Sequence, residues 1–98
     1  MSDDIEIVLE DGETKGRYVV KAPDGAEAEM TFTKVGTRQI IIDHTGVPDA
    51  FRGQGVGAKM VERAVEDARA AGKIIIPLCP FAAAQFRRHP EWADVLKK

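Results

Sequence analysis

Residues 44–57 read HTGVPDAFRGQGVG, and they separate two parts of the chain that follow different hydrophobic patterns. Glycines 53, 55 and 57 stand where an apolar strand pattern ends and a helical pattern begins. The first N–H groups of a helix have no partner within the helix, and the helix dipole is positive there. Glycines before such a helix let another atom approach the backbone closely. The stretch therefore predicts a cradle for a phosphate or pyrophosphate, to which Arg52 can add a charge-assisted contact. A flexible turn before a glycine-rich helix start is the alternative that these residues leave open.

The part of the chain before this stretch reads as antiparallel strands. Apolar residues alternate with polar ones, as in the run AEAEMTFT, which gives a strand one apolar face and one wet face. The sequences EDGE, PDG and KVGTR mark turns between the strands. The pattern predicts a four-stranded meander with strands at residues 5–10, 17–22, 26–33 and 39–45.

The part after the stretch changes to a helical period. Apolar side chains recur at helical spacing over residues 55–71, and Gly72 is well placed to end that helix. A short apolar strand at 73–77 then follows, and a strand–helix–strand unit normally pairs its strands in parallel. A second helix is predicted at 81–89, and a final helical turn or tail after it. The fold class is therefore mixed, α+β or α/β, with helices packed on a mixed sheet, in one domain over residues 1–98.

The composition narrows the function classes. The formal charge of −2, with 31% charged and 44% hydrophobic residues, is ordinary for a soluble globular protein and disfavours a broad nucleic-acid surface. One cysteine excludes an internal disulfide and a cysteine-cluster metal site, and two distant histidines make structural zinc improbable, so no metal is expected. No apolar run is long enough to span a bilayer, and the acidic start has no apolar signal region. We expect a cytoplasmic protein, a monomer or weak dimer, with no nucleic-acid or membrane partner.

The motif Arg52-x-x-Gly55-x-Gly57 resembles the Q/R-x-x-G-x-G/A loop of the GNAT acetyltransferase superfamily, which binds the pyrophosphate of coenzyme A. The segment VPDAFRGQGVG is similar to the lead-in of that loop. A small single-domain subfamily also has a histidine at the end of the fourth strand (here HTGVP), a cysteine after the fifth (here IIPLCPF) and a late HPEW-like segment. The resemblance covers about residues 18–95. It implies a GNAT-like fold, in which an antiparallel meander is followed by β-α-β-α around a splayed parallel strand pair.

The resemblance implies acetyl-CoA or coenzyme A as the cofactor. Pantetheine would lie along the end of the fourth strand, where a backbone N–H can polarise the thioester carbonyl. The residues that the resemblance places at the cofactor are Gly46, Val47, Arg52, Gly53, Gln54, Gly55, Val56, Gly57, Phe86 and Arg88.

Two residues are candidates for catalysis, since His44 and Cys79 would both face the thioester end of the cofactor. Histidine is a residue type suited to taking a proton, so His44 either deprotonates the amine, directly or through water, or only shapes the site. Cys79 has three interpretations: a proton donor to the leaving thiolate, a covalent acetyl carrier, or a small buried side chain.

The remaining candidates lie near the end of the chain. Phe81 and Phe86 either flank the cofactor or fill the core, with the core favoured for both. Arg87 and Arg88 either meet the 3′-phosphate, with Arg88 favoured, or complement the end of a helix. His89 reads as a helix-end residue. Elsewhere, Trp92 is expected to anchor the final segment by packing, and Glu27 and Glu29 receive no role.

These observations favour an acetyl-CoA-dependent N-acetyltransferase with an unidentified amine acceptor. Larger GNAT enzymes insert two helices between the first two strands, where this chain has only DGETKG. An open site of that kind could admit a bulky acceptor, such as a peptide or protein amine. The alternatives are a coenzyme A or acyl-CoA binding module with little transfer activity, and an interaction domain that has lost the cofactor. The intact loop argues against the last.

Overall fold

The computed structural model describes residues 6–51 and 53–97. The strands are β1 (Val8–Asp11), β2 (Lys15–Lys21), β3 (Glu27–Val35), β4 (Gln39–Gly46) and β5 (Ile74–Pro77). The α-helices are α1 (Val56–Ala71) and α2 (Pro80–Arg88), and two 3₁₀ segments are η1 (Asp49–Phe51) and η2 (Pro90–Val95). The predicted order of elements is confirmed, with boundaries that differ by at most three residues. Ile5, where the first strand was predicted to begin, lies outside the described residues.

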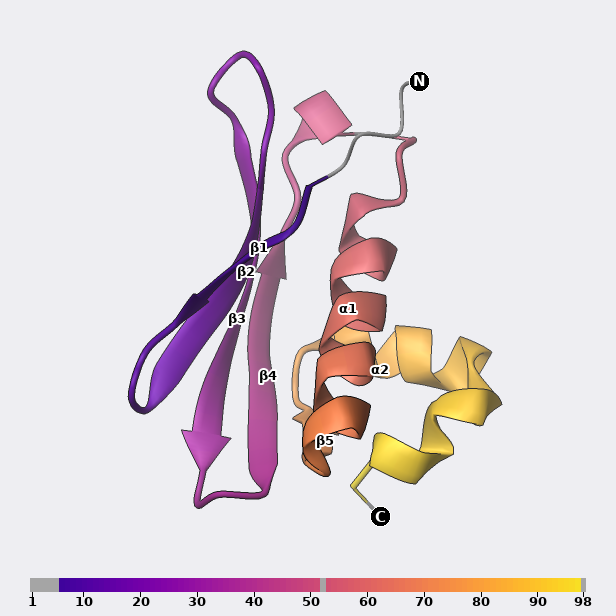
Figure 1. Ribbon diagram of the computed structural model, residues 1–98. Coiled ribbons are helices and arrows are strands. Elements are labelled where there is room, and N and C mark those ends of the chain that lie inside the picture. The colour runs from indigo at the N-terminus through magenta and orange to yellow at the C-terminus, as the bar shows by residue number, and fades with distance from the viewer. Residues whose placement is uncertain (1–5, 52, 98) are drawn as a thin grey trace.

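The strands form one mixed sheet whose spatial order, β1-β2-β3-β4-β5, repeats their order in the chain (Figure 1). The first four strands pair antiparallel, as short turns between them require. The α1 crossover returns the chain to the same edge, so β5 pairs parallel with β4, Ile40 lying opposite Ile75. The predicted mixed sheet with a parallel pair at β4 and β5 is therefore confirmed.

Helix α1 is bounded by two glycines. Gly55 precedes it with φ 66° and Gly72 follows it with φ 70°, and both values lie in the left-handed region that side chains disfavour. The N–H of Gly72 bonds to the carbonyls of Ala68 and Arg69, which satisfies groups that a helix end leaves open. The predicted glycine stop is confirmed.

The hydrophobic core lies on one face of the sheet, between the strands and the two helices, which Figure 1 shows on the same side. Its fully buried side chains come from β3, β4, α1 and β5, and the largest are Met30, Ile42, Met60 and Ile75. On the opposite face, which we call the outer face, Arg17 bonds to Glu10 and Glu29 at 2.7 Å each. One side of the sheet is thus apolar and covered, and the other is charged.

A bulge in β4 changes which side chains point to each face. Phe32 pairs with Ile42, but its neighbour Thr31 pairs with His44, so β4 has one extra residue at this point. The extra residue is Asp43, whose carboxylate accepts a 2.7 Å hydrogen bond from the Thr33 hydroxyl. Beyond the bulge the alternation of the strand is reversed.

The last segment packs against the body of the protein. Trp92 is buried, its ring stacked 4.0 Å from the ring of His89 and edge-on to Phe86 at 5.4 Å. Leu96 forms an isolated parallel bridge with Ile75, and the N–H of Lys97 bonds to the Ile75 carbonyl at 2.9 Å. The predicted packing role of Trp92 is confirmed. Within the described part of the chain, no helix is long and apolar enough to cross a membrane.

Candidate active site

The start of α1 has backbone N–H groups that the helix itself does not use. No side chain caps it and its first turn has no acidic residue. The N–H of Lys59 makes the first helical bond, to the Gly55 carbonyl at 3.0 Å, so the N–H groups of residues 56–58 have no partner within the helix. The geometry therefore fits an anion, as the glycine pattern predicts.

Not every predicted loop residue contributes in the same way. Gly53 has φ 81°, so this bend also depends on glycine. The N–H of Gln54 is already used, since it bonds to the Phe51 carbonyl at 3.1 Å and closes the turn. Arg52, the predicted cationic contact, lies outside the described residues.

Gly57 marks the point where three elements meet. A Cβ added at Gly57 would lie 2.7 Å from Cζ of Phe81, at the start of α2, and 3.5 Å from Cγ2 of Val47, just beyond β4. Phe81 is 37% exposed and Val47 41% exposed, so both present open apolar surface beside the start of α1. Phe81 is not a core residue, and the core interpretation of it was wrong.

Strands β4 and β5 part at this end of the sheet. Their last paired residues are Ile42 and Pro77, and β4 continues to Gly46 while the other chain turns into α2. One hydrogen bond, from the N–H of Cys79 to the Ile42 carbonyl at 3.1 Å, closes the ladder. Beyond that bond β4 still pairs with β3, but on its other side it has no paired strand among the described residues.

Cys79 stands where β4 and β5 part, as the residue that precedes the first turn of α2. It is 6% exposed, and its thiol donates a hydrogen bond to Thr45 Oγ1 at 3.4 Å. Burial raises the pKa of the thiol. The hydrogen bonds that Cys79 shares with the Thr45 hydroxyl and with the N–H groups of Ala82 and Phe81 outweigh burial, so the pKa lies below its ordinary value. Cys79 is therefore buried, and its thiol is more acidic than an ordinary cysteine thiol.

His44 and Cys79 lie on opposite faces of β4. Directly paired residues share a face, so His44 shares the outer face with Thr31, whereas Thr45 shares the core face with Met30. A Cβ at Gly46 would lie 3.4 Å from Nε2 of His44, so the imidazole lies beside the last residue of the strand. His44 is exposed, and no hydrogen bond joins it to Cys79 in the described structure. The structure thus brings both residues to the end of β4, but not to each other.

The predicted contacts on α2 lie away from its first turn. Phe86 is buried in the core against Trp92, which agrees with the core interpretation rather than with the cofactor contact. Arg87 and Arg88 are exposed in the last turn of α2, where they complement the helix dipole.

A hollow on the outer face adjoins the end of β4. It has a volume of about 430 Å³ and is lined by Glu27, Glu29, Gly46, Val47 and Pro48. The sequence analysis assigned no role to Glu27 and Glu29. Polar residues on one strand do not reveal which residues of the neighbouring strand lie beside them. Pairing Glu29 with Gly46 places these two carboxylates beside the expected site of chemistry.

Comparisons with known proteins agree with this architecture. Residues 17–95 match the sequence profile of the family described as GCN5-related N-acetyl-transferase. The NMR solution structure of a "GCN5-like putative N-acetyltransferase" from Staphylococcus aureus is 38% identical and superposes with a TM-score of 0.72. The match covers 99% of this chain and 91% of that one. A search of curated proteins finds no match.

The mixed sheet with its parted parallel pair is a GNAT-type acetyltransferase fold. The chain belongs to the GCN5-related N-acetyltransferase family, and the prediction of an acetyltransferase is confirmed at that level. The family in general uses acetyl-CoA.

Proposed function

We propose that this protein transfers the acetyl group of acetyl-CoA to an amine, with the site at the parted ends of β4 and β5. The observation that carries the proposal is the uncapped, glycine-led start of α1, which opens beside that gap. Acetyl-CoA supplies the acetyl group as a thioester and an anionic pyrophosphate for the free N–H groups. Family membership supports acetyl transfer in general.

In this proposal, backbone groups make most of the polar contacts with acetyl-CoA. The N–H groups of Val56 and Gly57 bind the pyrophosphate, and Arg52 adds a charge. The exposed side chains of Val47 and Phe81 cover the apolar pantetheine arm. A backbone N–H at the end of β4, near Gly46 and Val47, polarises the thioester carbonyl.

The two candidate catalytic residues suit different protons, because they lie on opposite faces of β4. His44, on the exposed outer face, accepts the proton of the incoming amine. Cys79, on the core face, gives its proton to the departing thiolate, and its lowered pKa makes it a stronger acid. A covalent carrier role needs a base beside the thiol, and His44 points to the other face. We therefore favour the proton donor.

The acceptor in this proposal is a cationic amine, such as a lysine side chain or a polyamine. Glu27 and Glu29 border the hollow beside Gly46, and a carboxylate there would hold a second ammonium group. Arg17 bonds to Glu29 at 2.7 Å and lies 3.5 Å from Glu27, which Lys21 also approaches at 3.9 Å. Both carboxylates are therefore partly neutralised, and the longer contacts of Glu27 make it the more available partner for an ammonium group. No helix covers the outer face of the described residues, so a peptide amine could reach His44.

One alternative is a coenzyme A binding module with little transfer activity, in one domain of residues 1–98. The same open outer face favours it, since no wall holds a small acceptor in place. We expect a cytoplasmic monomer or weak dimer under either proposal.

Calorimetry with acetyl-CoA, coenzyme A and 3′-dephospho-coenzyme A tests the cofactor. If Arg88 meets the 3′-phosphate, Arg88→Gln weakens coenzyme A but leaves the dephospho form unchanged. Absence of binding of all three at millimolar concentration would exclude both proposals.

Turnover is then followed by release of free thiol, with spermidine, a lysine peptide and a neutral-tailed amine as acceptors. His44→Gln should lower kcat, because the proposed acceptor of the amine proton is lost. The matched control is His89→Gln, because His89 stacks on Trp92 away from β4. Tight binding without turnover of any acceptor would favour the binding module.

A further inference from the structure

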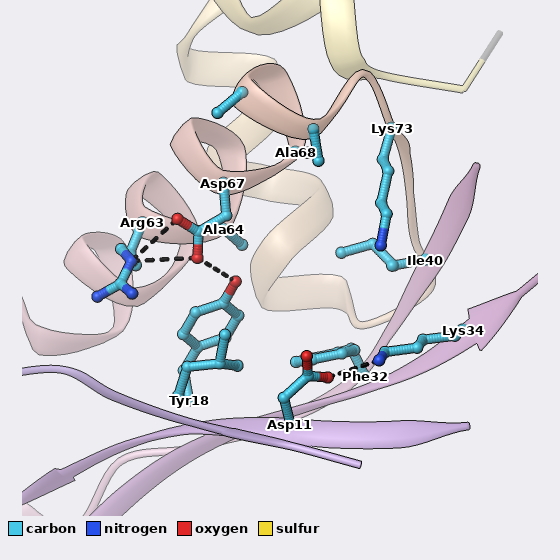
Figure 2. Close-up of a pocket in the computed structure, with 13 residues that line it drawn as sticks. Asp11, Tyr18, Phe32, Lys34, Ile40, Arg63, Ala64, Asp67, Ala68 and Lys73 are labelled. Carbon is cyan, nitrogen blue, oxygen red and sulfur yellow. Dashed lines mark hydrogen bonds and ion pairs between the residues drawn. The ribbon is translucent and has the colours of Figure 1, made fainter. Parts of the chain in front are cut away.

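A second hollow lies at the opposite end of the sheet from the candidate active site. It has a volume of about 380 Å³ and opens between the second half of α1 and the core face of β1 to β4 (Figure 2). Ile40, the second residue of β4, lines it, whereas Gly46 ends that strand at the active site. Six residues of strand separate the two by roughly 20 Å. The hollow is therefore a separate place on the molecule, and its function does not depend on acetyl transfer.

The hollow exists because α1 carries small side chains where it faces the sheet. Ala64 and Ala68, one turn apart on the same face of α1, lie opposite the rings of Tyr18 and Phe32. Earlier on the helix, that face carries larger side chains such as Met60, which are fully buried. Alanine opposite aromatic rings leaves an apolar slot, open at one side.

The polar groups around the slot are paired, with one exception. Lys34 bonds to Asp11 at 2.6 Å, and Arg63 bonds to Asp67 at 3.1 Å. The Tyr18 hydroxyl donates to the same Asp67 carboxylate at 2.8 Å. These contacts leave each carboxylate with a cation of its own, so neither is available to a further positive group.

The exception is Lys73, which follows α1 and is half-buried. Figure 2 shows its side chain extending over Ile40 along the edge of the slot. Among the described residues, its ammonium group has no ion pair or hydrogen bond. The lining thus holds three cations and two carboxylates, so it has one uncompensated positive charge beside an apolar surface.

We propose that this slot binds a small amphipathic anion, namely a flat apolar body carrying one carboxylate. The body lies over the nearly closed floor of the slot, where Ala68, Tyr18 and Phe32 are 3–4% exposed, and against the exposed Ala71. The carboxylate pairs with Lys73. The volume is at the lower end of the range for small-molecule sites, which fits one or two fused rings. An ammonium without a partner among the described residues, beside an apolar surface, is a favourable place for the carboxylate of an amphipathic ligand, because the contact is charge-assisted.

Three probes of similar shape test the proposal by titration of the full chain, followed by amide NMR. Indole-3-acetate carries the carboxylate, indole-3-acetamide is neutral and tryptamine is cationic. We expect indole-3-acetate to shift residues 63–73 and the facing strands, and to bind at least about tenfold more tightly than the other two.

Substitutions test whether Lys73 is the cation that pairs with the carboxylate of the probe. Lys73→Gln should reduce the affinity for indole-3-acetate to that for the amide, while Lys59→Gln, an exposed lysine near the other end of α1, should not. Ala71→Phe, at an exposed position that lines the slot, should weaken the binding of indole-3-acetate and of indole-3-acetamide to the same extent.

Three outcomes would overturn the proposal. They are equal affinity for all three probes, no shifts at millimolar probe, and shifts at residues 53–57 that coenzyme A reverses. The last would show that the anion prefers the start of α1.

Discussion

Replacing Gly55 by alanine tests whether the start of α1 is shaped to hold an anion. Gly55 has φ 66° and ψ 27°, and a Cβ added there meets no atom of the described residues within 4 Å. The only penalty in the free protein is therefore the left-handed backbone, about 1–2 kcal/mol. For a domain of this size, that loss corresponds to a decrease of about 4–16 °C in Tm.

The matched control is Gly36→Ala, in the turn between β3 and β4. Gly36 has φ 61° and also meets nothing within 4 Å of an added Cβ, so its replacement carries the same strain far from α1. The two variants should lose similar stability. Only Gly55→Ala should also lose affinity for acetyl-CoA, because relaxation of residue 55 turns the following N–H away from the pyrophosphate.

The expected loss of affinity follows from one hydrogen bond to a charged group, about 1.5–3 kcal/mol, or about 10- to 150-fold in Kd. Thermal unfolding and calorimetry with acetyl-CoA measure the two quantities on the same samples. Equal affinities for Gly55→Ala and Gly36→Ala would refute the cradle, and an unchanged Tm in both would refute the argument from backbone strain.

Three other changes have defined outcomes. Thr45→Val removes the hydroxyl that helps to lower the pKa of Cys79, so the pH midpoint of thiolate absorbance should move upward; an unchanged midpoint would contradict the assigned cause. Burial and the bond to Asp67 raise the pKa of Tyr18. The tyrosine therefore ionises at lower pH in the unfolded chain than in the folded protein. The stability that this group adds is present below about pH 10 and is lost as the pH rises further. Tyr18→Phe should cost about 1.5 kcal/mol at neutral pH and weaken that alkaline loss in urea unfolding; parallel pH curves for both proteins would contradict this. Trp92→Ala should cost about 3–5 kcal/mol in the same assay, and a value under about 1 kcal/mol would show that the final segment does not anchor the body.

The sequence predicted those elements whose signals are local. Gly72 ends α1 by its own backbone preference, and the alternation along β3 places its polar and apolar faces correctly. Helix α2 was predicted at 81–89 and begins one residue earlier, at Pro80. The parallel pairing of β4 with β5 followed from the length of the crossover.

The side of the sheet on which His44 lies was not predictable in this way. Simple alternation would put His44 on the core face with Ile40 and Ile42, but the bulge at Asp43 moves it to the outer face. A bulge depends on the pairing with another strand, here at Thr31, which alternation along one strand does not reveal. The prediction that Phe81 fills the core was wrong for a related reason. Its ring lies beside Gly57, which is distant in sequence.

The sequential strand order has a consequence for how the protein is made. Each of the first four strands can pair with the one synthesised just before it, so most of the sheet can assemble from neighbouring contacts as the chain emerges. Strand β5 must wait for all of α1, and its free edge is covered only when Leu96 bridges to Ile75. Strand β4 therefore gains its parallel neighbour last, so a nascent chain has most of its core before the proposed active site is complete.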